Sequence, residues 1–264
     1  MNKALIGYSG FVGSTILKQT SFEYLYRSSN ISDIKDISFG TVVCAGVSAQ
    51  KWIANNDPET DKIKIEGLMT HLKSMFCHTF ILVSTVDVFK DPVGVDENTN
   101  INESGLQAYG LHRRLLEKFV ENHFPNYLIV RLPGLVGAGL RKNIIFDFLN
   151  HNNLHTIESR SFFQFYPMIN LWGDIQTALN AGLNLVHLTA EPISVADISK
   201  KGFDRPFDNE LSNPPVNYDM RTIHAKTFGA SGYYQYSACE TLEAVRHYAQ
   251  SENISINPKI EAQS

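Results

Sequence analysis

Three glycines near the start of the chain, Gly7, Gly10 and Gly13, have a spacing suited to holding a dinucleotide. They follow directly on a short apolar run, Ala4-Leu5-Ile6. The first glycine permits a tight turn after a strand, the second lets the backbone approach a pyrophosphate, and the third lets the next helix pack on the strand. The amides at that helix start attract phosphate. The pattern predicts a cofactor-binding turn made of Gly7, Ser9, Gly10, Phe11, Val12 and Gly13.

The segments around this turn alternate between strand and helix patterns. Apolar runs typical of strands cover 4–6, 22–26, 41–44, 80–83 and 127–130, and helical patterns cover 14–19, 60–75 and 109–122. This alternation predicts an α/β fold of Rossmann type, with a doubly wound, mostly parallel sheet covered on both faces. Such sheets bind ligands at the carboxyl ends of their strands.

The pattern changes after Pro133, where closely spaced glycines indicate a loop. We expect a first domain over 1–135, with a return strand near 185–198. A small discontinuous C-terminal lobe would follow over 136–184 and 199–250, and a polar tail over 251–264. Ser237 and Glu240 form a capping-box pattern, which predicts a final helix through Tyr248.

Composition narrows the class of protein. The chain has 264 residues, 43% hydrophobic and 19% charged, which is ordinary for a globular enzyme. A formal net charge of −4 gives no sign of a nucleic-acid or polybasic membrane partner. Widely spaced Cys44, Cys77 and Cys239 argue against disulfides and a zinc site, and favour the cytoplasm. We expect neither a signal peptide nor a spanning helix.

Two further motifs follow the glycine turn in a fixed order. Val83-Ser84-Thr85-Val86-Asp87-Val88-Phe89 places a hydroxyl pair at the end of a buried strand, and Tyr109-Gly110-Leu111-His112-Arg113 begins a helix. Together with the glycines, over residues 1–190, these motifs resemble the extended short-chain dehydrogenase/reductase family. The resemblance implies an NAD(P)-dependent enzyme that acts on a nucleotide-linked sugar, with the C-terminal lobe binding the substrate.

The resemblance also implies roles for individual residues. Thr85, four residues before Phe89, matches the hydroxyl that hydrogen-bonds to the substrate oxygen, with Ser84 as the alternative. Tyr109 matches the general acid or base that moves a proton while hydride moves to or from nicotinamide. A free tyrosine has a pKa of about 10, so this role near neutral pH calls for a neighbouring positive charge.

Position 113 departs from the family, which has a lysine one helical turn after the tyrosine. Arg113 keeps the positive charge on the same helix face, but it cannot lose a proton in a relay. We favour a lysine-like role for Arg113. Proton transfer by His112, or cofactor binding with weakened catalysis, are the alternatives. Taken alone, His112 is expected to be a solvated surface residue, and Arg114 lies at a different angle on the helix.

The residues after the second strand bear on cofactor choice. Folds that prefer NAD place a carboxylate there to hold the ribose 2′-hydroxyl. The chain has Tyr26-Arg27-Ser28-Ser29-Asn30 instead. Arg27 and Ser28 are suited to hold a 2′-phosphate, so the sequence favours NADP over NAD.

Looser matches to the family supply the remaining site predictions. Ala45 and Gly46 would line the cofactor groove, and Pro133 would lie near nicotinamide. The expected substrate contacts are Asp87, Asn143, Gln164 and Arg221, the last through a diphosphate. The acidic run of Asp57, Glu59 and Asp61 is expected to be a solvated helix start rather than a metal site.

The sequence thus predicts an oxidoreductase that reduces a 4-keto group, with Tyr109 as the acid. An epimerase that uses the same residues is one alternative, and a non-catalytic NADP-binding sensor or scaffold is another. The family resemblance also implies a homodimer through the helices near Leu68 and Leu116.

Overall fold

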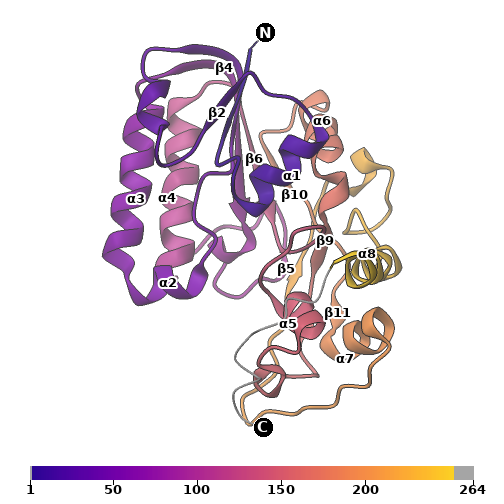
Figure 1. Ribbon diagram of the computed structural model, residues 1–264. Coiled ribbons are helices and arrows are strands. Elements are labelled where there is room, and N and C mark those ends of the chain that lie inside the picture. The colour runs from indigo at the N-terminus through magenta and orange to yellow at the C-terminus, as the bar shows by residue number, and fades with distance from the viewer. Residues whose placement is uncertain (1, 253–264) are drawn as a thin grey trace.

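A six-stranded parallel sheet forms the centre of the computed structural model, which describes residues 2–252 (Figure 1). The strands run in the order β10-β6-β4-β3-β1-β2, and every neighbouring pair is parallel. Their bounds are β1 (Lys3–Ile6), β2 (Tyr24–Tyr26), β3 (Ser38–Cys44), β4 (Phe76–Thr85), β6 (Tyr127–Leu132) and β10 (Leu185–His187). The predicted α/β fold class is therefore confirmed.

Helices cover both faces of the sheet, as Figure 1 shows. α3 (Pro58–Leu72) and α4 (Ala108–His123) lie side by side on one face, while α1 (Phe11–Gln19) and α6 (Leu171–Asn180) lie on the other. Alternate strand residues point to opposite faces, so Ala4 and Ile6 pack with α3 and α4, whereas Leu5 packs with α1 and α6. This explains why the strands are continuous apolar runs.

A second apolar core lies below the carboxyl ends of the strands. It is built from α5 (Ile144–Asn150), α7 (Val195–Asp197), α8 (Ala238–Ser251) and short strands, with Phe148 and Val245 fully buried. Its short strands are β7 (Gly134–Val136), β8 (Phe162–Phe163), β9 (Phe165–Pro167) and β11 (Ile193–Ser194). Two more, β5 (Val93–Val95) and β12 (Asp219–Met220), pair with each other and belong to a separate apolar cluster. β10 returns to the main sheet beside β6.

The last helix begins as the sequence predicts. Ser237 accepts from the backbone of Glu240, whose side chain accepts from the backbone of Ser237, so the capping box is present. α8 runs through Ser251, three residues beyond the predicted end. Of the predicted polar tail, 253–264 lies outside the described residues.

Leu116, which marks one of the two helices predicted to form a dimer interface, itself belongs to the core. It is 1% exposed and packs on the sheet with Val120 and Ile129. The outward face of the α3–α4 pair carries other apolar side chains, such as Ile63 and Leu111. Between residues 2 and 252 there is no helix that could cross a membrane and no group of three or more His, Cys, Asp or Glu placed to hold a metal.

Candidate active site

The glycine turn lies at the point where the strand order reverses, between β1 and β3. Gly7 has a φ of +86°, and a Cβ there would collide with Gly46 at the end of β3. A Cβ on Gly13 would collide with the Gly7 carbonyl. Gly10 is different, because a Cβ there meets protein only at 3.5 Å. Two glycines are thus required by the fold, while the third leaves open space at the start of α1, where ligands bind in such sheets.

A cavity of about 1750 Å³ opens from this turn along the carboxyl ends of the strands. It brings together most of the residues predicted from sequence. The predicted residues that line it are Gly7, Ser9, Gly10, Phe11, Val12, Arg27, Ser28, Ala45, Gly46, Ser84, Thr85, Asp87, Tyr109, Arg113, Pro133, Asn143 and Gln164. Gly13 and Arg221 are not among its lining residues.

Thr85 and Tyr109 meet in this cavity because a glycine lets two elements touch. Thr85 ends β4, and its hydroxyl accepts from the Asp87 amide at 3.2 Å to begin a 3₁₀ turn, Val86–Val88. A Cβ on Gly110 would collide with the Asp87 carbonyl, so only glycine allows α4 to approach this turn. As a result the Thr85 hydroxyl lies near enough to the Tyr109 phenol to act on its pKa.

Tyr109 itself is buried, with 8% of its surface exposed. Burial raises the pKa of its phenol above the ordinary value, and the nearby Asp87 carboxylate adds to this. Arg113, Thr85 and Lys51 act on the same pKa in the lowering direction, but burial outweighs them. Arg113 thus acts on the pKa of Tyr109 in the expected direction, but its effect is smaller than that of burial.

The Arg113 side chain forms an ion pair with the carboxylate of Asp61, a residue that the sequence predicted to be exposed to solvent. Its guanidinium makes a two-pronged contact with Asp61 of α3, at 2.5 and 3.0 Å, and also donates to the Ser48 carbonyl at 2.6 Å. His112 Nδ1 lies 2.7 Å from the same carboxylate. Asp61 and His112 are only 7% exposed, so the prediction that both are solvated is wrong. The reason is that α3 and α4 pack against each other along their length.

A second ion pair lies on the other side of Thr85. Lys51, from the short helix α2 (Lys51–Asn56), contacts the Asp87 carboxylate at 2.6 Å. The Thr85 hydroxyl donates to the other oxygen of that carboxylate at 3.3 Å, and the Tyr218 hydroxyl lies 3.5 Å from Asp87. The predicted substrate contact Asp87 is thus already paired within the protein. Sequence reading missed α2, because six residues show no clear periodicity.

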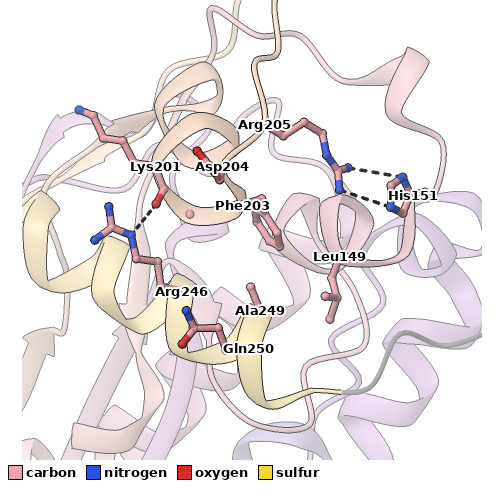
Figure 2. A pocket seen from close by; sticks show the side chains of 10 residues that line it. Leu149, His151, Lys201, Phe203, Asp204, Arg205, Arg246, Ala249 and Gln250 are labelled. Carbon is pink, nitrogen blue, oxygen red and sulfur yellow. Dashed lines mark hydrogen bonds between the residues drawn. The ribbon is translucent and has the colours of Figure 1, made fainter.

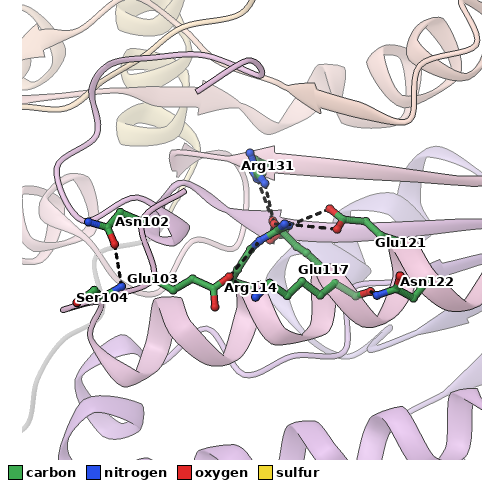
Figure 3. Close-up of polar contacts among 10 residues, drawn as sticks. Asn102, Glu103, Ser104, Arg114, Glu117, Glu121, Asn122 and Arg131 are labelled. Atoms are coloured by element: carbon green, nitrogen blue, oxygen red, sulfur yellow. Dashed lines mark hydrogen bonds and ion pairs between the residues drawn. The ribbon is translucent and has the colours of Figure 1, made fainter. Parts of the chain in front are cut away.

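Ser84 hydrogen-bonds into a buried charge network. Figure 3 shows Glu117, Arg114 and Arg131 of this network. The Ser84 hydroxyl donates to Glu117 at 2.5 Å, and Glu117 is fully buried. Arg131 of β6 and Arg114 of α4 both ion-pair with Glu117, at 2.7 and 2.9 Å. Arg114 reaches this network and not the Tyr109 face, in agreement with its predicted angle. The Ser84 hydroxyl is therefore committed to holding β4, α4 and β6 together.

Three residues that were predicted to contact the substrate instead form hydrogen bonds or an ion pair with other groups of the protein. The Asn143 side chain accepts from the amides of Ile145 and Phe146, which caps α5. Gln164 is 1% exposed, and its amide nitrogen lies within 2.9 Å of three acceptors, on Thr189, Ala190 and Met220. Arg221 pairs with Asp219 at 2.7 Å, away from the cavity. These placements give the three residues structural roles.

Lys142 is a residue that sequence reading missed. It lines the cavity beside Asn143, and its ammonium donates to the Ala49 carbonyl across the groove. Burial, and then the charge of Arg113, lower its pKa. The glycine-rich loop before it showed no local signal for this position.

A smaller cavity of about 390 Å³ lies beside α8 and contains none of the predicted residues (Figure 2). Arg246 donates through Nε to the Lys201 carbonyl at 2.6 Å, and Arg205 faces the edge of the His151 ring. The arginine side chains of this smaller cavity are hydrogen-bonded to the protein around it. We therefore assign the chemistry to the larger cavity, which contains the predicted residues.

Comparison with known proteins agrees with this architecture. The solved structures similar to this chain include a dTDP-4-dehydrorhamnose reductase from Clostridium acetobutylicum, with 16% identity over 95% of this chain and 99% of that chain and a TM-score of 0.71. A Thermotoga maritima UDP-glucose 4-epimerase, solved with UDP-glucose, has 13% identity over 95% and 98% and a TM-score of 0.68. A Bacillus anthracis dTDP-4-dehydrorhamnose reductase in complex with NADP has 14% identity over 96% and 99% and a TM-score of 0.69.

No protein-family model and no curated protein sequence matches the chain. The structural likeness extends over nearly the whole length of both partners in each comparison. The fold is therefore that of the extended short-chain dehydrogenase/reductases, as the ordered motifs predicted. More particularly, it is the fold shared by nucleotide-sugar reductases and epimerases.

Proposed function

We propose that the chain is an NADP-dependent oxidoreductase that reduces a keto group of a nucleotide-linked sugar. The observation that carries this proposal is the meeting of Thr85 and Tyr109 in the same cavity as the open glycine turn at Gly10. A phenol and a hydroxyl that lie together at the carboxyl edge of the sheet are suited to bind a carbonyl oxygen. Similar solved structures that are reductases support this assignment.

In the reaction, Tyr109 and Thr85 would bind the carbonyl oxygen of the substrate between them. A bound nicotinamide would supply hydride to the carbonyl carbon. As charge develops on the oxygen, the Tyr109 O–H bond breaks and its proton passes to that oxygen, while Thr85 donates a hydrogen bond that stabilises it. The raised pKa of Tyr109 keeps this proton in place at neutral pH. Burial of the phenol excludes water from the transfer.

The cavity's charge supports NADP as the cofactor. Its cationic lining residues are Lys18, Arg27, Lys51, Lys64, Arg113, Arg141 and Lys142, whereas its only acidic ones among the described residues are Asp61 and Asp87. Both carboxylates are ion-paired. Arg27 follows β2, and its side chain donates through Nε to the Ser29 hydroxyl at 3.0 Å. The open backbone at Gly10 and the excess of positive charge fit a pyrophosphate and a 2′-phosphate.

Turnover of NADPH with a panel of 4-keto nucleotide sugars tests the activity. We expect NADPH consumption with at least one member, and Tyr109→Phe should abolish it while leaving NADPH binding nearly unchanged. NADPH binding with no turnover of any keto sugar, and with no epimerisation, would favour the non-catalytic sensor or scaffold instead. Unchanged turnover in Tyr109→Phe would contradict the mechanism.

Binding of both cofactors tests the assignment of NADP. Arg27→Ala should weaken NADPH about tenfold, or about 1.4 kcal/mol, because it removes a charge-assisted contact with phosphate. NADH lacks that phosphate and should bind the variant and the original protein alike. An equal loss for both cofactors would show that Arg27 does not recognise the 2′-phosphate.

We further propose that 136–184 and 199–250 form the substrate side of the cavity and that the protein works in the cytoplasm. The free thiols support this location, since Cys44, Cys77 and Cys239 form no disulfide. A homodimer remains part of the proposal, with exposed residues such as Ile63 in place of Leu116 at the interface. Sedimentation of the full chain would give its oligomeric state.

A further inference from the structure

Both positive charges that act on Tyr109 are matched by carboxylates in direct contact with them. Arg113 is held by Asp61 through two hydrogen bonds, at 2.5 and 3.0 Å. Lys51 is held by Asp87 at 2.6 Å. An ion pair in contact exerts much less field on a third group than its cation would alone, because the two charges oppose each other. The phenol therefore faces two nearly neutral pairs.

The position of the guanidinium adds to this. The Arg113 carbon Cζ lies 3.9 Å from the centroid of the Tyr109 ring, so the cation lies over the ring. One of its nitrogens, Nη1, donates to the Tyr109 backbone carbonyl at 3.1 Å. Thr85, which also acts on the pKa of this phenol, is a neutral hydroxyl. The cation is thus held by its hydrogen bonds to Asp61 and to the backbone.

Three further ionisable groups lie near the site. Lys142, from the loop opposite α4, donates to the Ala49 carbonyl and has a lowered pKa. Tyr218, which packs beside Asp87, has a raised pKa and stays neutral, mainly because of burial. His112 lies against Asp61 on the α3 side. With Asp61, Asp87, Arg113 and Lys51, these are the groups that surround the site.

We propose that Asp61 and Asp87 act as positioning residues that keep Tyr109 in its protonated form, so that the site is a proton donor specialised for reduction. This inference rests on the proposed function for its reaction. Reduction forms a C–H bond from hydride and breaks the Tyr109 O–H bond, after which the tyrosinate recovers a proton from water. An epimerase that first oxidises the sugar alcohol to a ketone and then reduces it again begins with the opposite step. In that step an ionised Tyr109 must accept the proton of the alcohol.

The charge balance therefore favours a reductase over an epimerase that recycles its cofactor. At neutral pH only a small fraction of Tyr109 is ionised. As long as the pH stays below the pKa, this fraction increases about tenfold with each unit by which the pH increases. The oxidative step should show this dependence, whereas reduction should be nearly independent of pH around neutrality. Arginine at position 113, held by a carboxylate, produces a site of this kind.

Titration of tyrosinate absorbance tests the inference without any substrate. The difference between the original protein and Tyr109→Phe isolates this phenol, and it should be measured without cofactor and with NADPH. We expect Tyr109 to remain protonated up to about pH 10 or above. Ionisation near about pH 7 in the NADPH complex would overturn the proposal, whether or not a substrate is ever found.

Variants of the two carboxylates give the sign of the effect. Asp61→Asn and Asp87→Asn each free a cation, so each should lower the pKa of Tyr109 by about one unit or more. Lys51→Met should raise it, and Lys51→Arg should restore the original value. Glu103→Gln is the matched control, because Glu103 pairs with Lys118 outside the cavity. If neither asparagine variant lowers the Tyr109 pKa, the carboxylates do not hold its proton.

The reaction itself gives a second readout once a substrate is known. Asp87→Asn should move the pH profile of oxidation of the product alcohol to lower pH by the same amount as it lowers the Tyr109 pKa, because the oxidative step needs the ionised phenol. An unchanged pH profile, with the Tyr109 pKa shifted, would contradict the inference. Complete absence of turnover in every protein, with the titration as expected, would contradict the proposed function alone.

Discussion

The guanidinium carbon Cζ of Arg113 lies over the ring of Tyr109, 3.9 Å from its centroid, and the two residues are one helical turn apart on α4. Asp61 holds it in this position from the neighbouring helix α3. A lysine at position 113 would have a flexible chain and a single point of charge, whereas arginine has a planar fork that binds a carboxylate through two hydrogen bonds. Arg113 therefore belongs to a helix-to-helix contact as much as to the site.

Arg113→Lys, which restores the residue usual in the family, should accordingly destabilise this protein. Lysine cannot keep both contacts with Asp61 and the contact with the Ser48 carbonyl, so we expect a loss of about 1–3 kcal/mol. Urea unfolding measures this. Arg141→Lys is the control, because Arg141 is exposed and should change the free energy of unfolding by less than about 0.5 kcal/mol. Equal stability of Arg113→Lys would show that the fork is unimportant.

The neighbouring hydroxyls of Ser84 and Thr85 should separate stability from catalysis. Ser84→Ala leaves a lone pair of buried Glu117 unsatisfied, so it should cost about 1–3 kcal/mol of stability with little change in kcat. Thr85→Val, which keeps the shape and removes the hydroxyl, should lower kcat at least about tenfold through the lost contact to the reacting oxygen. The reverse pattern would make Ser84 the substrate-binding hydroxyl.

The residues that sequence reading placed well are those whose role is local. The glycine turn, the end of β4 and the start of α4 each carry their signal within a few residues, and their order along the chain suffices to bring Gly10, Thr85 and Tyr109 to one edge of a parallel sheet. The limits of β3 and β4 were predicted too short, because their first residues lack the apolar pattern of the sheet centre.

The residues that sequence reading misplaced depend on contacts between distant segments. Asp61 meets Arg113 across 52 positions, and Lys51 meets Asp87 across 36. An acidic residue in the first turn of a helix is usually solvated, and only the packing of α3 against α4 makes Asp61 a buried partner. The role of Asn143 could not be predicted either. It caps α5 with a backbone φ of +97°, and no local motif in the sequence indicates that conformation.

Gly110→Ala should disrupt the meeting of α4 with the Val86–Val88 turn. The added Cβ would collide with the Asp87 carbonyl, so helix and turn must separate and the variant should lose about 1–3 kcal/mol despite alanine's better helix propensity. Gly173→Ala in α6 is the matched control, because a Cβ there meets nothing within 4 Å. Chemical denaturation should find that control unchanged or slightly more stable. A stable Gly110→Ala would show that the contact can give way.

His187 should make the protein less stable in mild acid. Burial, and then the charge of nearby Arg131, lower the pKa of its imidazole from an ordinary 6.5 to about 4, against the opposing pull of Glu97. Arg131 can only donate, so Nε2 accepts at 3.2 Å and Nδ1 donates to the Arg221 carbonyl at 2.9 Å, an arrangement that requires a neutral ring.

The sign follows from proton binding by the two states. Below pH 6.5 the unfolded chain takes up a proton at His187 that the folded chain refuses, so stability falls as pH falls and the loss levels off near pH 4. The full loss corresponds to about 3 kcal/mol.

Urea unfolding of the original protein and of His187→Gln at about pH 7 and about pH 4.5 measures this loss. The difference in stability between the two proteins should shrink by about 2–3 kcal/mol at the lower pH. His123→Gln, at the exposed end of α4, should retain the original pH dependence. A His187→Gln variant that loses stability with acid as steeply as the original protein would show that His187 takes up its proton while still folded.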